Sequence, residues 1–369
     1  YRILSPHAGV RVSPLQLGAM SIGEKWRDTM GSMDKESSFK LLDAYYEAGG
    51  NFIDTANNYQ DEQSEEWIGE WAEKRGIRDQ LFIATKYTTN FKRGNQGVAQ
   101  QILYVGNGSK SLHISVEASL KKLRTSYLDL LYVHWWDHET SIEEVMRSLH
   151  TLVLARKVLY LGISDTPAWV VSKANQYARD HGLTPFSVYQ GMWNVMDRDF
   201  EREIIPMARN EGLALAPWNV LAAGKFRTDA EEEARSKNGE YRKMYAGFER
   251  TEKEKRVSKA LEKVAAEVGT KHITAVAIAY LLHKTPYVFP LVGGRKVEHL
   301  HANLEALDIS LTDAQMKELE AASELDLGFP SGFIVGHALY FCKDLVLNLF
   351  RYLGDWTRGW LDDGFCWNG

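Results

Sequence analysis

Short apolar runs alternate with longer amphipathic segments from residue 15 to residue 307. The short runs are apolar along nearly their whole length, as expected for strands that are buried on both faces of a parallel sheet. Eight such runs occur, which is the number needed to close a (β/α)8 TIM barrel. In chain order the predicted strands are Leu15–Ala19, Asn51–Asp54, Leu81–Lys86, Leu128–His134, Val158–Ser164, Phe186–Gln190, Leu213–Trp218 and Tyr287–Gly293.

The segments between these strands have the spacing of amphipathic helices. The clearest one begins after Thr140 and Ser141, where Glu143 and Glu144 indicate a capping box. Its apolar residues then recur at helical intervals and form one stripe that faces the sheet. This alternation predicts βα units within a single domain. Further helices are predicted at Lys35–Ala48, Ser64–Lys74, Leu112–Arg124 and Pro167–Asp180.

Several stretches interrupt the alternation. Residues 1–13 predict a small hairpin that precedes the barrel. Residues 87–109 form a loop rich in glycine and asparagine, and residues 229–254 form a highly charged insertion. Loops of this length are usually functional lids or mobile segments. We assign residues 1–323 to one barrel domain. Residues 324–369, rich in aromatic side chains, are assigned to a C-terminal extension that packs on the barrel or on a partner subunit.

The bulk composition excludes several classes of protein. The apolar content of 44% and the charged content of 25% are ordinary for a soluble globular protein. A net charge of −5 argues against a nucleic-acid partner. No run of about 18 apolar residues predicts a membrane span, and the N-terminus lacks the pattern of a signal peptide. The two cysteines, Cys342 and Cys366, fit a reducing compartment. We therefore expect a cytoplasmic protein, and a homo-oligomer stays open.

Chemically useful side chains stand at the carboxyl ends of the predicted strands, where parallel α/β folds collect their chemistry. Asp54 ends the second strand, and Tyr59 follows in a polar loop. Lys86 ends the third strand and His134 ends the fourth. Each of these has a plainer explanation when it is taken alone, because such a lysine often extends to solvent and such a histidine is often structural. Their shared position at strand ends is what predicts a common site.

The four side chains would form a coherent acid–base site. Tyrosine has a pKa near 10 and is a weak acid at neutral pH. A nearby Lys86 ammonium would lower the pKa of Tyr59 by about 1–3 units, and Asp54 would hold that ammonium in place. His134 would orient a carbonyl oxygen or relay a proton. Such a site suits the protonation of an oxygen while a hydride arrives at its carbon. We expect no metal site, because the sequence has no cysteine cluster or histidine-rich motif.

The later strand ends also carry polar or basic residues. The eighth strand runs into two glycines and then into Arg295 and Lys296, ahead of a helix. Small residues followed by bases at a helix N-terminus suit a phosphate group, and an ordinary βα turn is the alternative. The fifth, sixth and seventh strands end at Ser164-Asp165, Gln190 and Trp218-Asn219.

These residues and their context resemble the aldo-keto reductases. Asp54, Tyr59, Lys86 and His134 match the catalytic tetrad of that family. The surrounding segments also match, as Gly-Gly-Asn-Phe-Ile-Asp-Thr-Ala-Asn-Asn-Tyr, Ile-Ala-Thr-Lys and Tyr-Val-His-Trp. Finer details resemble the fungal aryl-alcohol dehydrogenases and norsolorinic-acid-reductase-like members, in Ala-Pro-Trp-Asn-Val-Leu-Ala-Ala-Gly-Lys-Phe and Leu-Val-Gly-Gly-Arg-Lys-Val-Glu-His-Leu.

The resemblance implies an oxidoreductase that uses NADPH/NADP+ and interconverts aromatic aldehydes and benzylic alcohols, with Tyr59 as the general acid/base. It implies a nicotinamide site in which Gly18, Ala19 and Met20 adjoin the ribose, Ser164, Asp165 and Gln190 hold the carboxamide, and Trp218 stacks on the ring. It implies a pyrophosphate loop at Asn219, Leu221, Gly224 and Lys225. It also implies an adenosine-phosphate pocket at Gly293, Gly294, Arg295, Lys296 and His299, with Asn303 at the adenine. The family usually has Asn where Asp165 stands and Glu where Ala302 stands.

An aromatic pocket above the nicotinamide is predicted for the substrate. Its candidate walls are Trp26, Tyr87 and Trp135, together with Phe329 and Phe333 of the extension. Ordinary packing is the alternative for each of these residues.

Two other functions stay open. The chain could be an NADP-binding regulatory subunit that resembles the potassium-channel β-subunits, with the extension and the charged insertion as docking surfaces. A barrel hydrolase that uses Asp54 and His134 is the third interpretation. Turnover of an aryl aldehyde distinguishes an oxidoreductase from a regulatory subunit.

Overall fold

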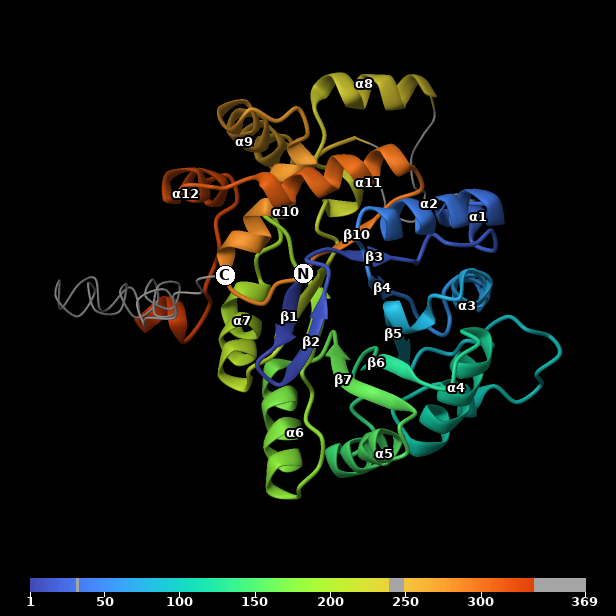
Figure 1. The fold of residues 1–369 in the computed structure, drawn as a ribbon. Coiled ribbons are helices and arrows are strands. Elements are labelled where there is room, and N and C mark those ends of the chain that lie inside the picture. Colours follow the sequence, from blue (N-terminus) through green and yellow to red (C-terminus); the bar gives the residue numbers. More distant parts are fainter. Residues whose placement is uncertain (31–32, 239–248, 335–369) are drawn as a thin grey trace, which may run out of the picture.

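Eight parallel strands form one sheet that curls into a nearly closed barrel (Figure 1). The computed structural model describes residues 1–30, 33–238 and 249–334, so most of the predicted C-terminal extension lies outside the described residues. The barrel confirms the predicted fold. Around it the strands follow the order β10 (Leu291–Gly293), β3 (Gln16–Gly18), β4 (Phe52–Asp54), β5 (Phe82–Tyr87), β6 (Leu128–Val133), β7 (Val158–Ser164), β8 (Val188–Met192) and β9 (Ala214–Trp218).

The last strand is shorter than predicted and the sixth is displaced. β10 begins only after Pro290, because proline has no N–H to donate to a ladder. The residues before Pro290 bond to β9 instead: Leu215 N donates to Tyr287 O, and Phe289 N donates to Leu215 O. These bonds bring the two ends of the sheet together. The sixth strand spans Val188–Met192 in place of the predicted Phe186–Gln190.

Helices surround the strands (Figure 1). Ser141 caps α5 as predicted, because its side chain accepts a hydrogen bond from Glu144 N. The reciprocal half of the capping box is absent, since the Glu144 carboxylate accepts from Ser109 N and Oγ instead. That contact ties α4 to α5. The helices are α1 (Arg27–Met30), α2 (Lys35–Glu47), α3 (Gln63–Arg75), α4 (Ser109–Lys122), α5 (Ile142–Leu154), α6 (Ala168–Asp180), α7 (Phe200–Glu211), α8 (Asp229–Asn238), α9 (Glu252–Val268), α10 (Ile273–Lys284), α11 (Val297–Leu304) and α12 (Asp313–Ala321).

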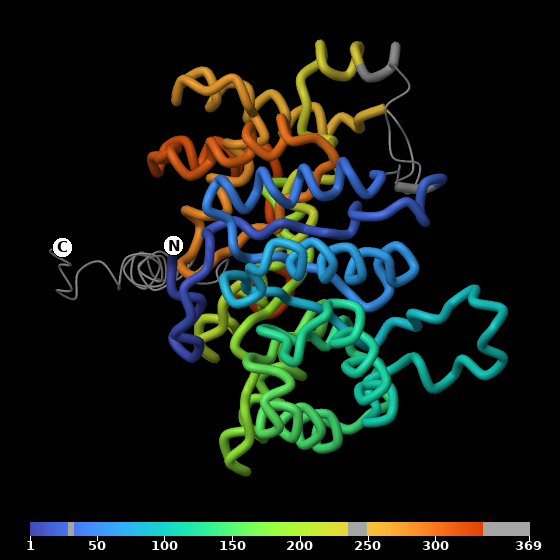
Figure 2. Tube along the Cα trace, turned by 45° about the vertical axis from the view of Figure 1, so that its right-hand side comes forward, coloured from blue at the N-terminus to red at the C-terminus, as the bar shows by residue number. Residues whose placement is uncertain are grey.

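The predicted hairpin closes one end of the barrel. It consists of β1 (Arg2–Ser5) and β2 (Ala8–Val12), which pair antiparallel. Leu4 and Val12 of the hairpin belong to one buried cluster with Phe52, Phe82 and Phe289 from the barrel interior. Figure 2 shows the hairpin, in dark blue, at one end of the molecule, while the loop between β5 and α4 projects at the other. An active site in this barrel therefore has to lie at the end opposite the hairpin.

The two internal insertions have different structures. The loop after β5 runs to residue 108 and contains a 3-10 turn at Ile102–Tyr104. The charged insertion contains α8, and residues 239–248 lie outside the described part. Arg250 is buried and pairs with Asp229 and Glu232, which joins the two arms of the insertion at their base. No helix in the described ranges is long and apolar enough to cross a membrane.

Candidate active site

The register of the barrel brings the predicted strand-end residues to one mouth. Gly293 of β10 pairs with Gly18 of β3, and Gly18 pairs with Asp54 of β4. Farther around the barrel, Ser164 pairs with Gln190, and Met192 of the same strand pairs with Trp218. Because all strands run in parallel, these side chains converge at their common carboxyl end.

A buried ion pair lies at the centre of this mouth. The Lys86 ammonium is 2.5 Å from Asp54 Oδ1 and also donates to Thr55 O at 2.8 Å. Lys86 and Asp54 are 0% and 1% exposed, so the lysine does not extend to solvent. The second oxygen of Asp54 accepts a hydrogen bond from Gln190 Nε2 at 2.8 Å. Both oxygens of the buried carboxylate are therefore satisfied, as an ion pair in a low-dielectric interior requires.

The lysine keeps its charge in this environment. Burial acts to lower the pKa of Lys86, but the charges and hydrogen bonds of Asp54 and Tyr59 outweigh it and raise that pKa above its usual 10.5. The ammonium lies 5.1 Å from the centre of the Tyr59 ring. A permanent positive charge therefore stands beside the tyrosine.

The pKa of Tyr59 differs from the sequence-based expectation. Lys86 acts to lower it as predicted, but burial is the larger influence, and the pKa of Tyr59 is raised above its usual 10.0. The sequence showed the neighbouring charge but not the loss of water around the ring. Tyr59 therefore stays protonated at neutral pH, which is the state that a proton donor needs.

His134 follows β6 and lies beside Tyr59. The two rings meet edge to face with centroids 6.0 Å apart. Burial and the Lys86 charge lower the pKa of His134 to about 3, so the imidazole is neutral at physiological pH. Its Nδ1 lies 3.3 Å from Thr89 Oγ1. Of the two roles predicted for His134, a neutral ring held in this way favours orienting an oxygen over relaying a proton.

The turn after Tyr59 contributes residues that the sequence did not reveal. Gln60, Asp61 and Glu62 all have positive φ, at 52°, 50° and 81°. Left-handed backbone costs non-glycine residues roughly 1–2 kcal/mol each. Gln60 offsets part of this cost because its buried amide donates to Met20 O and accepts from Trp26 N. No local sequence signal indicates such a turn, because these partners lie far along the chain.

The predicted substrate wall is only partly formed by the candidate residues. The rings of Trp26 and Tyr59 meet edge to face, with their centroids 6.2 Å apart. The indole N–H of Trp26 donates to Asp61 Oδ1 at 2.9 Å. The Trp135 indole donates to Thr89 Oγ1 at 3.0 Å, on the same hydroxyl that approaches His134. Both tryptophans are half-buried at the mouth and can contact a substrate.

Three other candidates for the wall have different surroundings. Tyr87 is fully buried, and its hydroxyl donates to Asn107 O, so it packs in the core and does not face the mouth. Phe329 and Phe333 are 87% and 57% exposed, with their rings 6.2 Å apart. The stretch before them is held at α7, where Arg202 Nε donates to Asp326 O.

The predicted nicotinamide residues are linked to one another and to the ion pair. Trp218 Nε1 donates to Asp165 Oδ1 at 3.1 Å, and Ser164 Oγ donates to Asp165 Oδ2 at 2.9 Å. Gln190 is joined to Asp54. On the opposite side of the mouth, Gly18 and Met20 are partly exposed, whereas Ala19 is fully buried and donates its N–H to Asp54 O.

The predicted pyrophosphate loop follows β9. Asn219 and Gly224 have positive φ, at 58° and 85°, so the chain turns sharply here. Leu221 packs partly against the core. The Lys225 ammonium donates to Glu249 O at 3.0 Å and lies 3.7 Å from Glu254 Oε2. The lysine is thus engaged by the segment that leads into α9.

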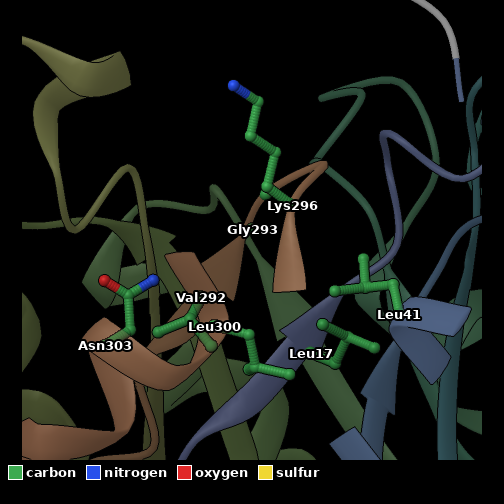
Figure 3. A pocket seen from close by; sticks show the side chains of 8 residues that line it. Leu17, Leu41, Val292, Gly293, Lys296, Leu300 and Asn303 are labelled. Atoms are coloured by element: carbon green, nitrogen blue, oxygen red, sulfur yellow. The ribbon is translucent and has the colours of Figure 1, made fainter. Parts of the chain in front are cut away.

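A small cleft lies at the end of β10, where the adenosine-phosphate pocket was predicted (Figure 3). A Cβ at Gly293 or Gly294 would meet its nearest protein atom at 4.0 or 3.8 Å, which is ordinary van der Waals contact, so neither position is crowded by the protein. Figure 3 shows the Lys296 side chain pointing away from the apolar floor. The residues that line the cleft are Leu17, Leu41, Val292, Gly293, Gly294, Lys296, Leu300 and Asn303.

The polar groups in this cleft and next to it fit a nucleotide. Asn303 is 4% exposed, and it lines the cleft. Arg295 is exposed just before α11 and forms no ion pair within those same ranges. His299 is exposed in the first turn of α11. An amide that lines the cleft next to exposed bases suits an adenosine and the phosphate on its ribose.

Comparison with known proteins gives a consistent result. Residues 14–324 match the model of the aldo/keto reductase family. An aryl-alcohol dehydrogenase (NADP(+)) of Phanerodontia chrysosporium is 64% identical over 336 residues, which cover 89% of this chain and 87% of that protein. A putative aryl-alcohol dehydrogenase of Saccharomyces cerevisiae is 58% identical, covering 90% and 89%. Norsolorinic acid reductase B of Dothistroma septosporum is 54% identical, covering 91% and 84%.

The protonation state of His134 can be measured directly. Because burial and Lys86 lower its pKa to about 3, we expect the ring nitrogen shifts of His134 to stay constant between pH 5 and pH 8. Nitrogen-15 NMR of the labelled protein measures this, and the spectrum of His134→Gln assigns the signal. An inflection of the His134 shifts between pH 6 and pH 7 would contradict the account.

Proposed function

The chain belongs to the aldo/keto reductase family, and we propose that it is an NADP(H)-dependent oxidoreductase that interconverts aromatic aldehydes and benzylic alcohols. The observation that carries this proposal is the buried Lys86–Asp54 pair beside Tyr59 and a neutral His134. The names of the relatives support the cofactor and the substrate class, and the overlap covers about nine-tenths of this chain.

The residues would divide the acid–base work as follows. The bound cofactor supplies or accepts the hydride. In the direction of reduction, Tyr59 gives its hydroxyl proton to the substrate oxygen, and in oxidation it takes that proton back. Burial keeps Tyr59 protonated until it acts, and the Lys86 charge stabilises the phenolate once the proton has left. His134, as a neutral ring, donates a hydrogen bond to the same oxygen and fixes its position.

Two parts of the barrel mouth would hold the two halves of the cofactor. Trp218, Ser164 and Asp165 lie where the nicotinamide is proposed to bind, and they are connected by hydrogen bonds. The cleft beside α11 offers Asn303 to the adenine and Arg295 to the 2′-phosphate. An arginine grips phosphate through two parallel hydrogen bonds. This geometry supports recognition of NADPH over NADH.

The hydrolase interpretation loses its support. A hydrolase would need Asp54 to activate a water or to attack a substrate. Asp54 is 1% exposed, and its oxygens are engaged by Lys86 and Gln190. The regulatory-subunit interpretation is decided by turnover, because a partner-docking role needs no catalysis.

An aldehyde panel tests the proposed function. Trp26 and Trp135 at the mouth favour an aromatic ring by roughly 0.5–1.5 kcal/mol per ring contact. One such contact alone predicts a kcat/KM for benzaldehyde about 2–10-fold above that of cyclohexanecarbaldehyde, a control of similar size that lacks the aromatic ring. NADPH oxidation by the full chain measures both. A preference for the saturated aldehyde would refute the aromatic pocket. If no aldehyde is turned over, the proposal that the chain is an oxidoreductase is wrong.

Replacement of Arg295 tests cofactor selectivity. A charge-assisted hydrogen bond contributes about 1.5–3 kcal/mol, so Arg295→Ala should weaken NADPH binding about 10–150-fold and leave NADH nearly unchanged. Binding titrations with both cofactors measure the effect. Arg93→Ala serves as the control, because Arg93 is also exposed but stands in the loop after β5. An equal loss of affinity for NADH and NADPH in Arg295→Ala would exclude a 2′-phosphate contact.

A further inference from the structure

Asp165 places a second carboxylate at the mouth of the barrel. It directly follows β7 and adopts a left-handed φ of 44°, which aspartate tolerates better than most residues. Its two oxygens accept hydrogen bonds from the Trp218 indole and the Ser164 hydroxyl, at 3.1 and 2.9 Å. Because both neighbours donate, the arrangement suits an ionised carboxylate, which is an acceptor only.

The charge of Asp165 is not neutralised locally. Asp54 has the Lys86 ammonium at 2.5 Å, but no lysine, arginine or histidine of the described residues lies within 4.0 Å of Asp165. The surrounding protein removes part of the water from Asp165 and raises its pKa, although the side chain stays exposed at the mouth; the hydrogen bonds from Ser164 and Trp218 and the more distant Lys86 partly oppose that rise. Asp165 in turn contributes to the raised pKa of Tyr59. Its field therefore reaches the catalytic group.

We propose that Asp165 sets the preference of this site between the two oxidation states of its cofactor, favouring NADP+ over NADPH. The inference rests on the proposed function, because it takes the nicotinamide to be the occupant beside Trp218. The ring carries a formal positive charge in NADP+ and none in NADPH. A carboxylate without a counter-ion attracts only the charged form, so the Coulomb interaction acts on one oxidation state.

A purely hydrogen-bonding role for Asp165 makes a different prediction. The carboxamide group is the same in NADP+ and NADPH, so an acceptor for its N–H bonds would strengthen both to a similar extent. The ratio of the Kd of NADP+ to the Kd of NADPH therefore distinguishes the two roles. The affinity for one cofactor alone does not distinguish them.

Asp165→Asn tests the charge while it keeps the size of the side chain and one acceptor oxygen. We expect the Kd of NADP+ to rise about 5–50-fold relative to that of NADPH, from the loss of one unit charge at a partly exposed site. Titrations monitored by intrinsic tryptophan fluorescence measure both constants without turnover, and circular dichroism verifies the fold. Equal changes in both constants, or no change in their ratio, would overturn the proposal.

Asp61→Asn provides the matched control. Asp61 is another exposed carboxylate of this mouth that accepts from an indole, that of Trp26, and the variant loses the same unit of charge. We expect its Kd ratio to stay within about twofold of the wild-type value, because Asp61 adjoins the substrate side and not Trp218. A ratio shift as large as that of Asp165→Asn would also overturn the proposal. If the unmodified chain binds neither dinucleotide, the proposed function fails as well; if it binds both and the Asp165→Asn ratio is unchanged, this inference fails alone.

Discussion

The buried pair of Lys86 and Asp54 is the constraint on which the rest of the site depends. Two charges removed from water are stable only when each is well paired, and loss of one partner typically costs about 3–5 kcal/mol. The barrel satisfies this demand from three strands, because β4 and β5 supply the pair and β8 supplies the Gln190 amide. Two neighbouring side chains are affected by this pair. Tyr59 has a fixed positive charge 5.1 Å from the centre of its ring, and His134 is kept neutral by burial and by the same ammonium.

The two carboxylates of the mouth differ in what surrounds them. Asp54 is buried and paired with Lys86, so its charge is neutralised by the lysine that it holds in place. Asp165 is held by an indole and a hydroxyl, which fix its position without cancelling its charge. An aspartate at one strand end, Asp54, therefore holds the lysine in place, whereas the aspartate at another, Asp165, can still interact with a ligand. The strained turn at Gln60 has a related role, because it connects the loop of Tyr59 to that of Trp26 through hydrogen bonds.

The sequence predicts the barrel, and it predicts that Asp54, Tyr59, Lys86 and His134 share one mouth, because both follow local rules. Buried parallel strands read as apolar runs, and the residue after each run falls at the mouth. Features that depend on distant partners were not predictable. The pKa of Tyr59 depends on burial by residues from several elements. Tyr87 belongs to a strand that is buried along its whole length, so the pattern could not show which way its side chain faces. The turn at Gln60 is stabilised by main-chain atoms of residues 20 and 26. The aromatic extension beyond residue 334 lies outside the described residues.

The central claim is that Lys86 acts on the reaction through Tyr59, and a double-mutant cycle tests it most directly. Tyr59→Phe, Lys86→Met and the double variant would be compared by kcat for an aromatic aldehyde, with folding verified by urea denaturation. Each single change should lower kcat by about 10²–10⁴, the usual contribution of a positioned acid. Because the two residues act as one unit, the double variant should be within about threefold of the slower single variant. Losses that multiply in the double variant would show that the two residues work independently and would contradict the account.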